Sequence, residues 1–487
     1  MTIVIIPLLV ALITALVTLL LYRRPSLQQA ASIAGAVILL FSAVWQVNAV
    51  LNEGAIAVGM GNWPYPYAIA FVADRLSGIM VLVSAALGVS VLVFYAGMPE
   101  SETASPMVHP LIHGLLAAVC GTVLTADLFN LYVWFELMLI TVLGLLVVND
   151  GLRNLEAAFK YFALNLLGTL LFLAAVALIY GVTGQLSFGG LAEAAQQPAV
   201  LSVLPVYVAM LMTAFLLKSA AFPFYFWLPS SYHTLPIPVL ALIGGLITKV
   251  GVYVMLRIMG EVFVIQPQVF YLALGWIAVA TMVSGVLGAA YHWDLRRILA
   301  FHIVSQIGYL LLAVALASPQ SGAAGVFFMV HNILAKATLF LIAGIMWRSA
   351  GHYDLRRIGG LYPARPVLAM CFLIAGFSLV GVPPSSGFWG KFLLVQEAFA
   401  QEHFIWGGFA LAVGVLTLYS MVKIWMEGFW KPHPAGPVNT PAATGQSLCN
   451  AVVVVLVALL VVIGVYPEPL IEYSTLATSS LWPQELK

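Results

Sequence analysis

The sequence predicts an all-α, polytopic membrane protein with about fourteen transmembrane helices. Of its 487 residues, 63% are hydrophobic and only 8% are charged, whereas soluble proteins carry about 25% charged residues. Uncharged apolar runs recur from one end of the chain to the other, and a run of about 20 such residues can cross a bilayer as a helix. Proline interrupts two of these runs, which predicts two helices that break at membrane depth.

The candidate spans follow one another through short connections. We place them at residues 2–21, 30–51, 74–97, 108–126, 128–149, 156–181, 202–228, 237–260, 268–291, 298–317, 322–347, 366–400, 404–429 and 447–466. The first run lacks a basic start and a small-residue cleavage site, so we interpret it as a retained span and not as a signal peptide. Residues 431–446 are expected to be a flexible inner loop, and residues 466–487 a short outer tail.

The two proline-broken spans indicate an internal repeat. The seventh span carries Lys218 before Pro223 and Pro229, and the twelfth carries Pro383–Pro384 before Lys391. Broken backbone at membrane depth is tolerated only inside protein or beside water. Each broken span is the fourth of five, in spans 4–8 and 9–13. Because five is odd, the second set is expected to be inverted relative to the first, which is typical of transporters.

The predicted organisation therefore has four parts. These are N-terminal helices at 1–107, a first five-helix repeat at 108–260, an inverted second repeat at 268–429, and an inner loop, last helix and outer tail at 430–487. Lys and Arg gather in the loops after spans 1, 5, 9, 11 and 13. The positive-inside rule places these loops in the cytoplasm and both termini outside.

Five charged residues in the middle of apolar runs are the candidate functional residues. They are Glu136, Lys218, Lys249, Lys336 and Lys391. A charge at the centre of a span costs about 2.5–3.5 kcal/mol on insertion scales, so such residues pair with one another or mark an ion path. Burial penalises the ammonium form of a lysine, and interacting groups titrate together. A row of them is therefore suited to passing protons. The alternative is that the lysines snorkel to an interface or pair structurally.

Histidines are the natural relay groups near neutral pH. His331 lies in the span at 322–347, five residues before Lys336, and is the histidine that we expect to take part. A packing histidine held by hydrogen bonds is the alternative. The sequence leaves the roles of His233, after the first broken span, and of His302 open.

Several classes of function are excluded or disfavoured. A net charge of +1 gives no electrostatic argument for binding nucleic acid. There is no Walker motif, no haem ligand pair and no dinucleotide-binding fingerprint, so we expect no cofactor. The three cysteines lie far apart, in or beside apolar runs, and form no metal motif. We therefore expect no metal site, and a transporter component in place of an enzyme.

Several longer motifs resemble one known family. Residues 216–258, LLKSAAFPFYFWLPSSYHTLPIPVLALIGGLITKVGVYVMLRI, look like the core of the antiporter-like subunits of respiratory complex I and of the Mrp-type multisubunit Na⁺/H⁺ antiporters. DLFNLYVWFELM, WDLRRILAFHIVSQIGY, HNILAKATLF and GVPPSSGFWGKF match the same family in order and spacing. Together the motifs cover the chain from the third to the thirteenth span.

Two details resemble the D-type subunit of the Mrp branch. Respiratory members usually carry a PDAH-like sequence and then PVSA after the first broken helix, where this chain has PSSYH and PVLA. The closest-sized complex I subunit usually has glutamate at the position of Lys391. The resemblance implies fourteen helices, inverted repeats, and roles in proton translocation for Glu136, Lys218, Lys249, Lys336 and Lys391. The departure at PSSYH leaves the role of His233 in doubt.

The resemblance also implies a function and partners. We expect a proton-translocating subunit of a multisubunit Na⁺/H⁺ antiporter in the bacterial cell (inner) membrane. Its partners would be other membrane subunits, the transported H⁺ and Na⁺, and the lipid bilayer. The alternative is a non-redox, proton-pumping subunit of respiratory complex I or of a membrane-bound hydrogenase. A self-sufficient solute transporter is a third hypothesis.

Overall fold

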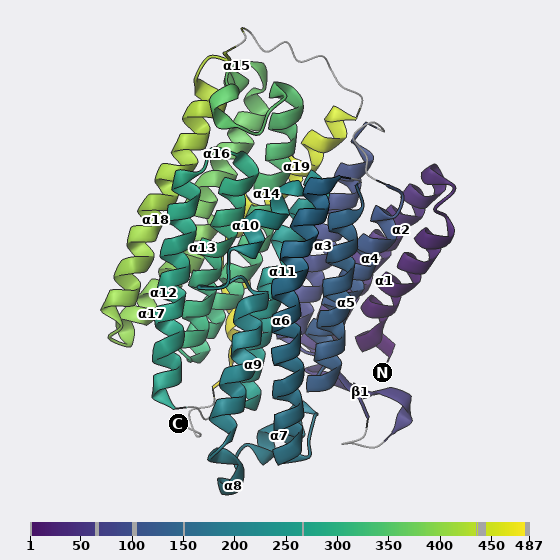
Figure 1. Ribbon diagram of the computed structural model, residues 1–487, viewed down its shortest axis with the longest axis vertical. Helices are drawn as coiled ribbons and strands as arrows, with labels where there is room; N and C mark the ends of the chain where they lie inside the picture. Colours follow the sequence, from purple (N-terminus) through teal and green to yellow (C-terminus); the bar gives the residue numbers. More distant parts are fainter. Residues whose placement is uncertain are drawn as a thin grey trace.

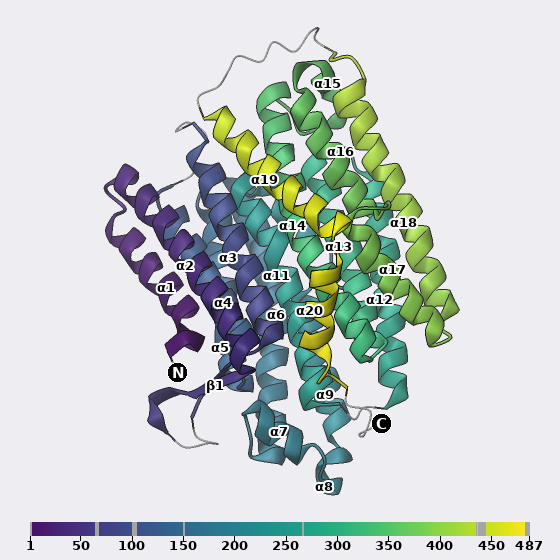
Figure 2. The same ribbon diagram turned by 180° about the vertical axis from the view of Figure 1, so that it is seen from behind.

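The chain folds into a bundle of long helices that lie along one common direction. The computed structural model describes residues 2–63, 68–99, 105–149, 151–264, 267–434, 436 and 445–482. Figures 1 and 2 show α1 (Thr2–Leu20) and α2 (Pro25–Glu53) on one flank and α18 (Phe404–Ile424) on the other. Among the described residues there is one short hairpin, β1 (Ile56–Gly59) with β2 (Ala70–Ala73), which packs against one end of the bundle. The all-α fold class is confirmed.

The remaining helices, most of which follow the expected spans, continue in chain order. They are α3 (Arg75–Ala96), α4 (Val108–Leu124), α5 (Leu128–Val147), α6 (Leu152–Thr183), α7 (Phe188–Ala194), α8 (Pro198–Leu201), α9 (Leu204–Lys218), α10 (Trp227–Ser231), α11 (Ile237–Arg257), α12 (Gln268–Tyr291), α13 (Leu295–Ala315), α14 (Pro319–Ala350), α15 (Leu361–Ala364), α16 (Pro366–Val380), α17 (Ser386–Ala400), α19 (Gln446–Val465) and α20 (Glu468–Thr478). Short 3₁₀ turns occur at Met60–Asn62, Tyr232–Thr234 and Leu355–Arg357, and π-helical turns extend α11 (Ile258–Val262) and α18 (Trp425–Trp430).

Length and composition identify the membrane-crossing helices. In the described part of the chain, eleven helices are long and apolar enough to span a bilayer, and α4, α9 and α16 are shorter apolar helices. Every expected span coincides with one helix or with a broken pair. The number fourteen remains a prediction, as do the four-part division and the inversion of the second repeat.

Both expected helix breaks are present. Helix α9 ends at Lys218, and the chain is not helical again until Trp227. Helix α16 ends at Val380, and α17 begins at Ser386. Proline lacks the N–H that the helix needs and clashes with the preceding turn, which explains why each interruption contains proline. At the second break, Gly381 has φ +92°, a conformation that glycine adopts without steric cost.

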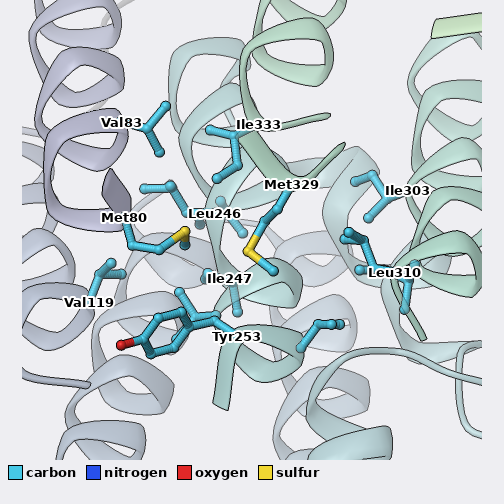
Figure 3. Packing of buried hydrophobic residues seen from close by; sticks show 14 of the residues in the cluster. Met80, Val83, Val119, Leu246, Ile247, Tyr253, Ile303, Leu310, Met329 and Ile333 are labelled. Carbon is cyan, nitrogen blue, oxygen red and sulfur yellow. The ribbon is translucent and has the colours of Figure 1, made fainter. Parts of the chain in front are cut away.

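Two helices occupy the centre of the bundle. All of α11 is buried, and α14 is buried from Ser321 to Met346. Figure 3 shows Leu246, Ile247 and Tyr253 of α11 packed with Met80 of α3 and Met329 of α14. The outer helices instead expose many large apolar side chains. This pattern is expected of a bundle surrounded by lipid and other membrane subunits.

The C-terminal segment is more ordered than the expected short tail. It contains helix α20, which packs back along the bundle (Figure 2). Tyr473 donates a hydrogen bond to the Arg75 carbonyl at 2.9 Å, and Thr478 donates one to the Pro319 carbonyl at 3.0 Å. Trp482 is buried, and its backbone N–H bonds the Gly260 carbonyl. This segment therefore joins the ends of α3, α11 and α14.

Candidate functional site

The charged residues predicted from the sequence begin with a three-residue contact between α5, α6 and α9. Glu136 Oε1 lies 3.7 Å from Lys218 Nζ. The Thr169 hydroxyl donates to Glu136 Oε1 at 2.6 Å and accepts a hydrogen bond from Lys218 Nζ at 3.1 Å. The hydroxyl therefore connects the acid and the base, whose direct distance is too long for a hydrogen bond.

The end of α9 places Lys218 next to Glu136. Lys218 is the last residue of α9, beside the first break, and its ammonium group also lies 5.4 Å from the centre of the Phe135 ring. A cation over an aromatic face is stabilised by the ring quadrupole. The side chain of Glu136 is 23% exposed and that of Lys218 only 5%. Glu136 is thus the more accessible end of the pair.

Lys249 lies at the centre of the bundle. It is fully buried, and its Nζ donates a hydrogen bond to the Gly244 carbonyl of its own helix at 2.8 Å. Ser219, directly after Lys218, packs against Gly251, where an added Cβ would come within 2.2 Å of the serine hydroxyl oxygen. The first break therefore touches α11 two residues beyond Lys249. The partners of Lys218 are Thr169, Glu136 and Phe135, and that of Lys249 is Gly244, so the two lysines do not share a hydrogen bond.

Lys336 is the least satisfied of the lysines. It is fully buried in α14, and its ammonium group has no hydrogen-bond partner in the described part of the chain. Lys249 and Lys391 both lie within electrostatic range of it. Like charges in such a setting interact strongly, because the surroundings screen them poorly. The three lysines therefore form a coupled group.

Lys391 is hydrogen-bonded to backbone carbonyls at the second break. Its Nζ donates hydrogen bonds to the carbonyls of Leu379 and Val380, both at 2.9 Å. These residues end α16, where carbonyls lack helical partners and the helix dipole favours a cation. The same ammonium group lies 4.7 Å from the centre of the Tyr309 ring. The break thus supplies a site for this lysine.

His331 is tied to the second break by hydroxyl groups. Its Nδ1 lies 2.9 Å from Ser386 Oγ, which lies 2.9 Å from Ser378 Oγ. Its Nε2 is buried and has no partner among the described residues. Both Lys391 and Lys336 lie within electrostatic range of the ring. Charge on either of these lysines therefore acts on the His331 ring.

Further buried polar atoms surround the row without protein partners. Those on α11, α13 and α14 are Thr248 Oγ1, His302 Nδ1, Ser305 Oγ, Gln306 Nε2 and Oε1, and Asn332 Nδ2 and Oδ1. Buried polar groups are normally satisfied by protein or by ordered water. His302 has one partner, Ser420 Oγ at 2.9 Å from its Nε2. These helices therefore offer groups that water molecules can bridge between the lysines.

His233 lies at one end of the bundle, away from the row. Its Nδ1 is 3.1 Å from the Pro229 carbonyl oxygen, and its Nε2 is 3.5 Å from Arg297 Nη2. It lines a cavity of about 770 Å³. Burial, with the positive charges of Arg297 and Arg296, lowers the pKa of this histidine to about 4. His233 is therefore neutral at neutral pH.

The site residues predicted from the sequence are brought together in two groups. Glu136 and Lys218 form one, and Lys249, Lys336, Lys391 and His331 form the other. The sequence interpretation missed Thr169, although it shares one helix face with Asn165 in an otherwise apolar stretch of α6. It also missed Gln306 and Asn332, which are amides inside apolar spans. Over the described ranges, no group of three or more His, Cys, Asp or Glu residues could hold a metal ion.

A known protein family matches the part of the chain that contains the broken helices and the buried charges. The family described as "NADH:quinone oxidoreductase/Mrp antiporter, TM" matches residues 125–417, which include Glu136 and all four lysines. This chain belongs to that family. The match also contains both broken helices and the coupled lysine group.

Among family members, the D subunits of Na⁺/H⁺ antiporters are similar along the whole chain. The Na⁺/H⁺ antiporter D subunit of Alkalihalophilus pseudofirmus is 37% identical over 97% of this chain and 95% of its own. The protein of the same name from Bacillus subtilis is 31% identical over 95% and 94%. A chain in the structure of the Mrp complex from Dietzia sp. superposes with a TM-score of 0.90 at 28% identity, covering 100% of this chain and 99% of that one.

Proposed function

We propose that this chain is the proton-translocating D-type subunit of a multisubunit Na⁺/H⁺ antiporter. The observation that carries the proposal is the Glu136–Thr169–Lys218 contact beside a buried lysine group. Apolar side chains can replace buried charges with little loss of stability, so folding alone does not explain this set of charged residues. The similarity to D subunits over the whole chain length supports the same conclusion.

The pair at the first break would act as a coupled switch. The carboxylate of Glu136 stabilises the ammonium form of Lys218 while both are charged. When Glu136 takes up a proton, that stabilisation is lost, and Lys218 is favoured to release its own proton toward the interior. Interacting groups of this kind titrate as a pair.

The second group would carry protons onward. A proton arriving at Lys249 disfavours positive charge on Lys336. Positive charge on Lys336 in turn disfavours positive charge on Lys391. His331 and the polar atoms of α13 and α14 would support the water molecules between them. Inward movement of each proton gains about 2.3 kcal/mol per 100 mV of membrane potential. That energy would drive Na⁺ outward, with the Na⁺ route partly in other subunits.

The setting follows from the same proposal. The chain would lie in the bacterial cell membrane with both termini outside, in contact with other membrane subunits and lipid. The alternative, a proton-pumping subunit of a redox complex, rests on the same family. Two chains from respiratory complex I of Thermus thermophilus share this fold at 24% and 22% identity. Likeness at that level concerns the fold alone, so we favour the antiporter.

Transport assays of single variants test the proposal. Glu136→Gln and Lys218→Ala would each be expressed, with the partner subunits, in an antiporter-deficient strain and assayed in inverted vesicles by Na⁺-dependent collapse of the pH gradient. Both should lose most transport at normal expression. Glu193→Gln, at an exposed position of α7, is the matched control and should retain it. Normal transport in both site variants would sink the proposal.

A further inference from the structure

A cavity at the inner ends of the helices carries an excess of positive charge. It has a volume of about 770 Å³ and lies where α6, α12 and α13 end beside the first broken helix. Five basic and three acidic side chains line it: Arg153, Lys160, Arg296, Arg297 and Arg356, with Glu156, Asp294 and Asp354. It lies outside the row of buried lysines.

Three of the basic side chains are already neutralised. Lys160 pairs with Glu156 at 2.5 Å, Arg296 with Asp294 at 3.1 Å, and Arg356 with Asp354 at 2.7 Å. The other two basic side chains are left without a carboxylate.

Arg153 and Arg297 are these two residues. Neither side chain has a carboxylate partner in the part of the chain that the structure describes. The guanidinium of Arg297 lies 3.5 Å from the Nε2 atom of His233. A guanidinium fork matches phosphate geometry, which makes arginine the preferred residue for binding a phosphate group. The two guanidinium groups can therefore accept an anionic phosphate group.

The surroundings of the cavity are those of a membrane interface. On α12, Tyr291 is 80% exposed, and Leu287, one turn deeper, is also exposed. On α6, Phe159 and Leu155 are exposed beside Lys160. Aromatic side chains favour the headgroup level, and apolar ones the acyl chains. Both helices line the cavity, and Figure 1 shows α6 and α12 on the same face of the bundle.

We propose that this cavity binds the phosphate group of an anionic phospholipid, held by Arg153 and Arg297. The acyl chains would lie along the exposed apolar side chains of α6 and α12. Basic cavities between membrane helices on the cytoplasmic side are suited to such headgroups. A free phosphate ion shares the headgroup chemistry but lacks the apolar contacts, so the lipid fits both parts of the site.

Bound phosphate would also act on His233. The histidine contacts Arg297, whose positive charge opposes its protonation. An anion paired with Arg297 offsets that charge and makes protonation of the ring easier. The bound lipid would thus favour protonation of His233 without contacting the row of buried lysines.

Mass spectrometry of the intact complex, delipidated and held in detergent, tests the proposal. The probes are phosphatidylglycerol, cardiolipin and phosphatidylcholine, each added separately. The two anionic lipids should be retained, and phosphatidylcholine should not. The double variant Arg153→Gln/Arg297→Gln should weaken retention about thirtyfold. Arg23→Gln/Arg24→Gln, in the exposed inner loop after α1, is the matched control and should bind as the parent does.

A competition experiment distinguishes the two sources of phosphate. If inorganic phosphate displaces the lipid fully, the phosphate site is supported and its occupant is the soluble ion. If phosphate does not compete while the double variant still loses lipid, the lipid is the ligand. Equal retention of all three lipids, or unchanged retention by the double variant with normal thermal unfolding, would overturn the proposal.

Discussion

The carboxylate of Glu136 and the ammonium group of Lys218 lie 3.7 Å apart, with one hydroxyl hydrogen-bonded to both. That hydroxyl belongs to Thr169, on a third helix. It can donate to the carboxylate while accepting from the lysine, so it suits the state in which both groups are charged. Thr169 is therefore a positioning residue for the pair.

Removing this hydroxyl should slow transport without removing any charge. Thr169→Val keeps the shape of the side chain but leaves Glu136 and Lys218 without their bridge. A hydrogen bond to a charged group is worth about 1.5–3 kcal/mol, so we expect Na⁺-driven proton movement in vesicles to fall by about tenfold or more. Thr169→Ser should restore it. Thr141→Val is the control, because that hydroxyl bonds only carbonyls of its own helix; equal loss in both valine variants would contradict the role.

The second break should tolerate no side chain at Gly387. A Cβ there would lie 1.8 Å from the Ser378 carbonyl oxygen and 2.8 Å from His331 Nε2. Gly387→Ala must therefore push α16 and α17 apart, at a cost of about 1–3 kcal/mol or more. We expect a lower thermal unfolding temperature and loss of transport. Gly408→Ala in α18 meets nothing within 4 Å and should behave as the parent does.

The sequence revealed the charges of the site but not the groups that join them. Glu136 and Lys218 are conspicuous because a charge inside an apolar span is expensive wherever its helix packs. Thr169 is not, because a hydroxyl can bond its own helix at almost no cost. Its contacts join residues 33 and 49 positions apart, so they depend on how three helices are rotated against one another.

The two helix breaks follow from the local sequence, whereas the C-terminal helix depends on tertiary packing. Proline dictates a local interruption, so the breaks after Lys218 and Val380 were predictable from the sequence alone. Helix α20 was missed because its sequence is too polar for a membrane span, although Tyr473 and Thr478 bind it to the bundle. Burial against a neighbouring helix, and not hydropathy, holds that segment in place.

Acid should destabilise the protein around His233. Its pKa is lowered to about 4 by burial and by Arg297 and Arg296, while Asp294 acts in the opposite direction. An unfolded histidine titrates near 6.5. Between about pH 6.5 and pH 4 the unfolded chain therefore binds a proton that the folded chain excludes, and stability falls as the pH falls.

Thermal unfolding in detergent measures this effect. His233→Gln removes the titrating ring, so the variant should lose less stability than the parent between pH 6.5 and pH 4. His352→Gln, at an exposed position, is the control and should follow the parent. Identical pH dependence in the parent and His233→Gln would show that the ring is not held neutral by its surroundings.

Lys336 should weaken the fold while serving transport. Its ammonium group is buried without a hydrogen-bond partner among the described residues and lies near two other lysines. An unsatisfied buried polar group costs about 1–3 kcal/mol. Lys336→Met, similar in length and apolar, should therefore raise the thermal unfolding temperature and abolish transport. Lys391→Met should abolish transport with less stabilisation, because that lysine already has two carbonyl partners and an aromatic ring. Unfolding curves and vesicle transport on the same samples decide this: a destabilised Lys336→Met, or one that still transports, would show that Lys336 serves the fold and not the proton path.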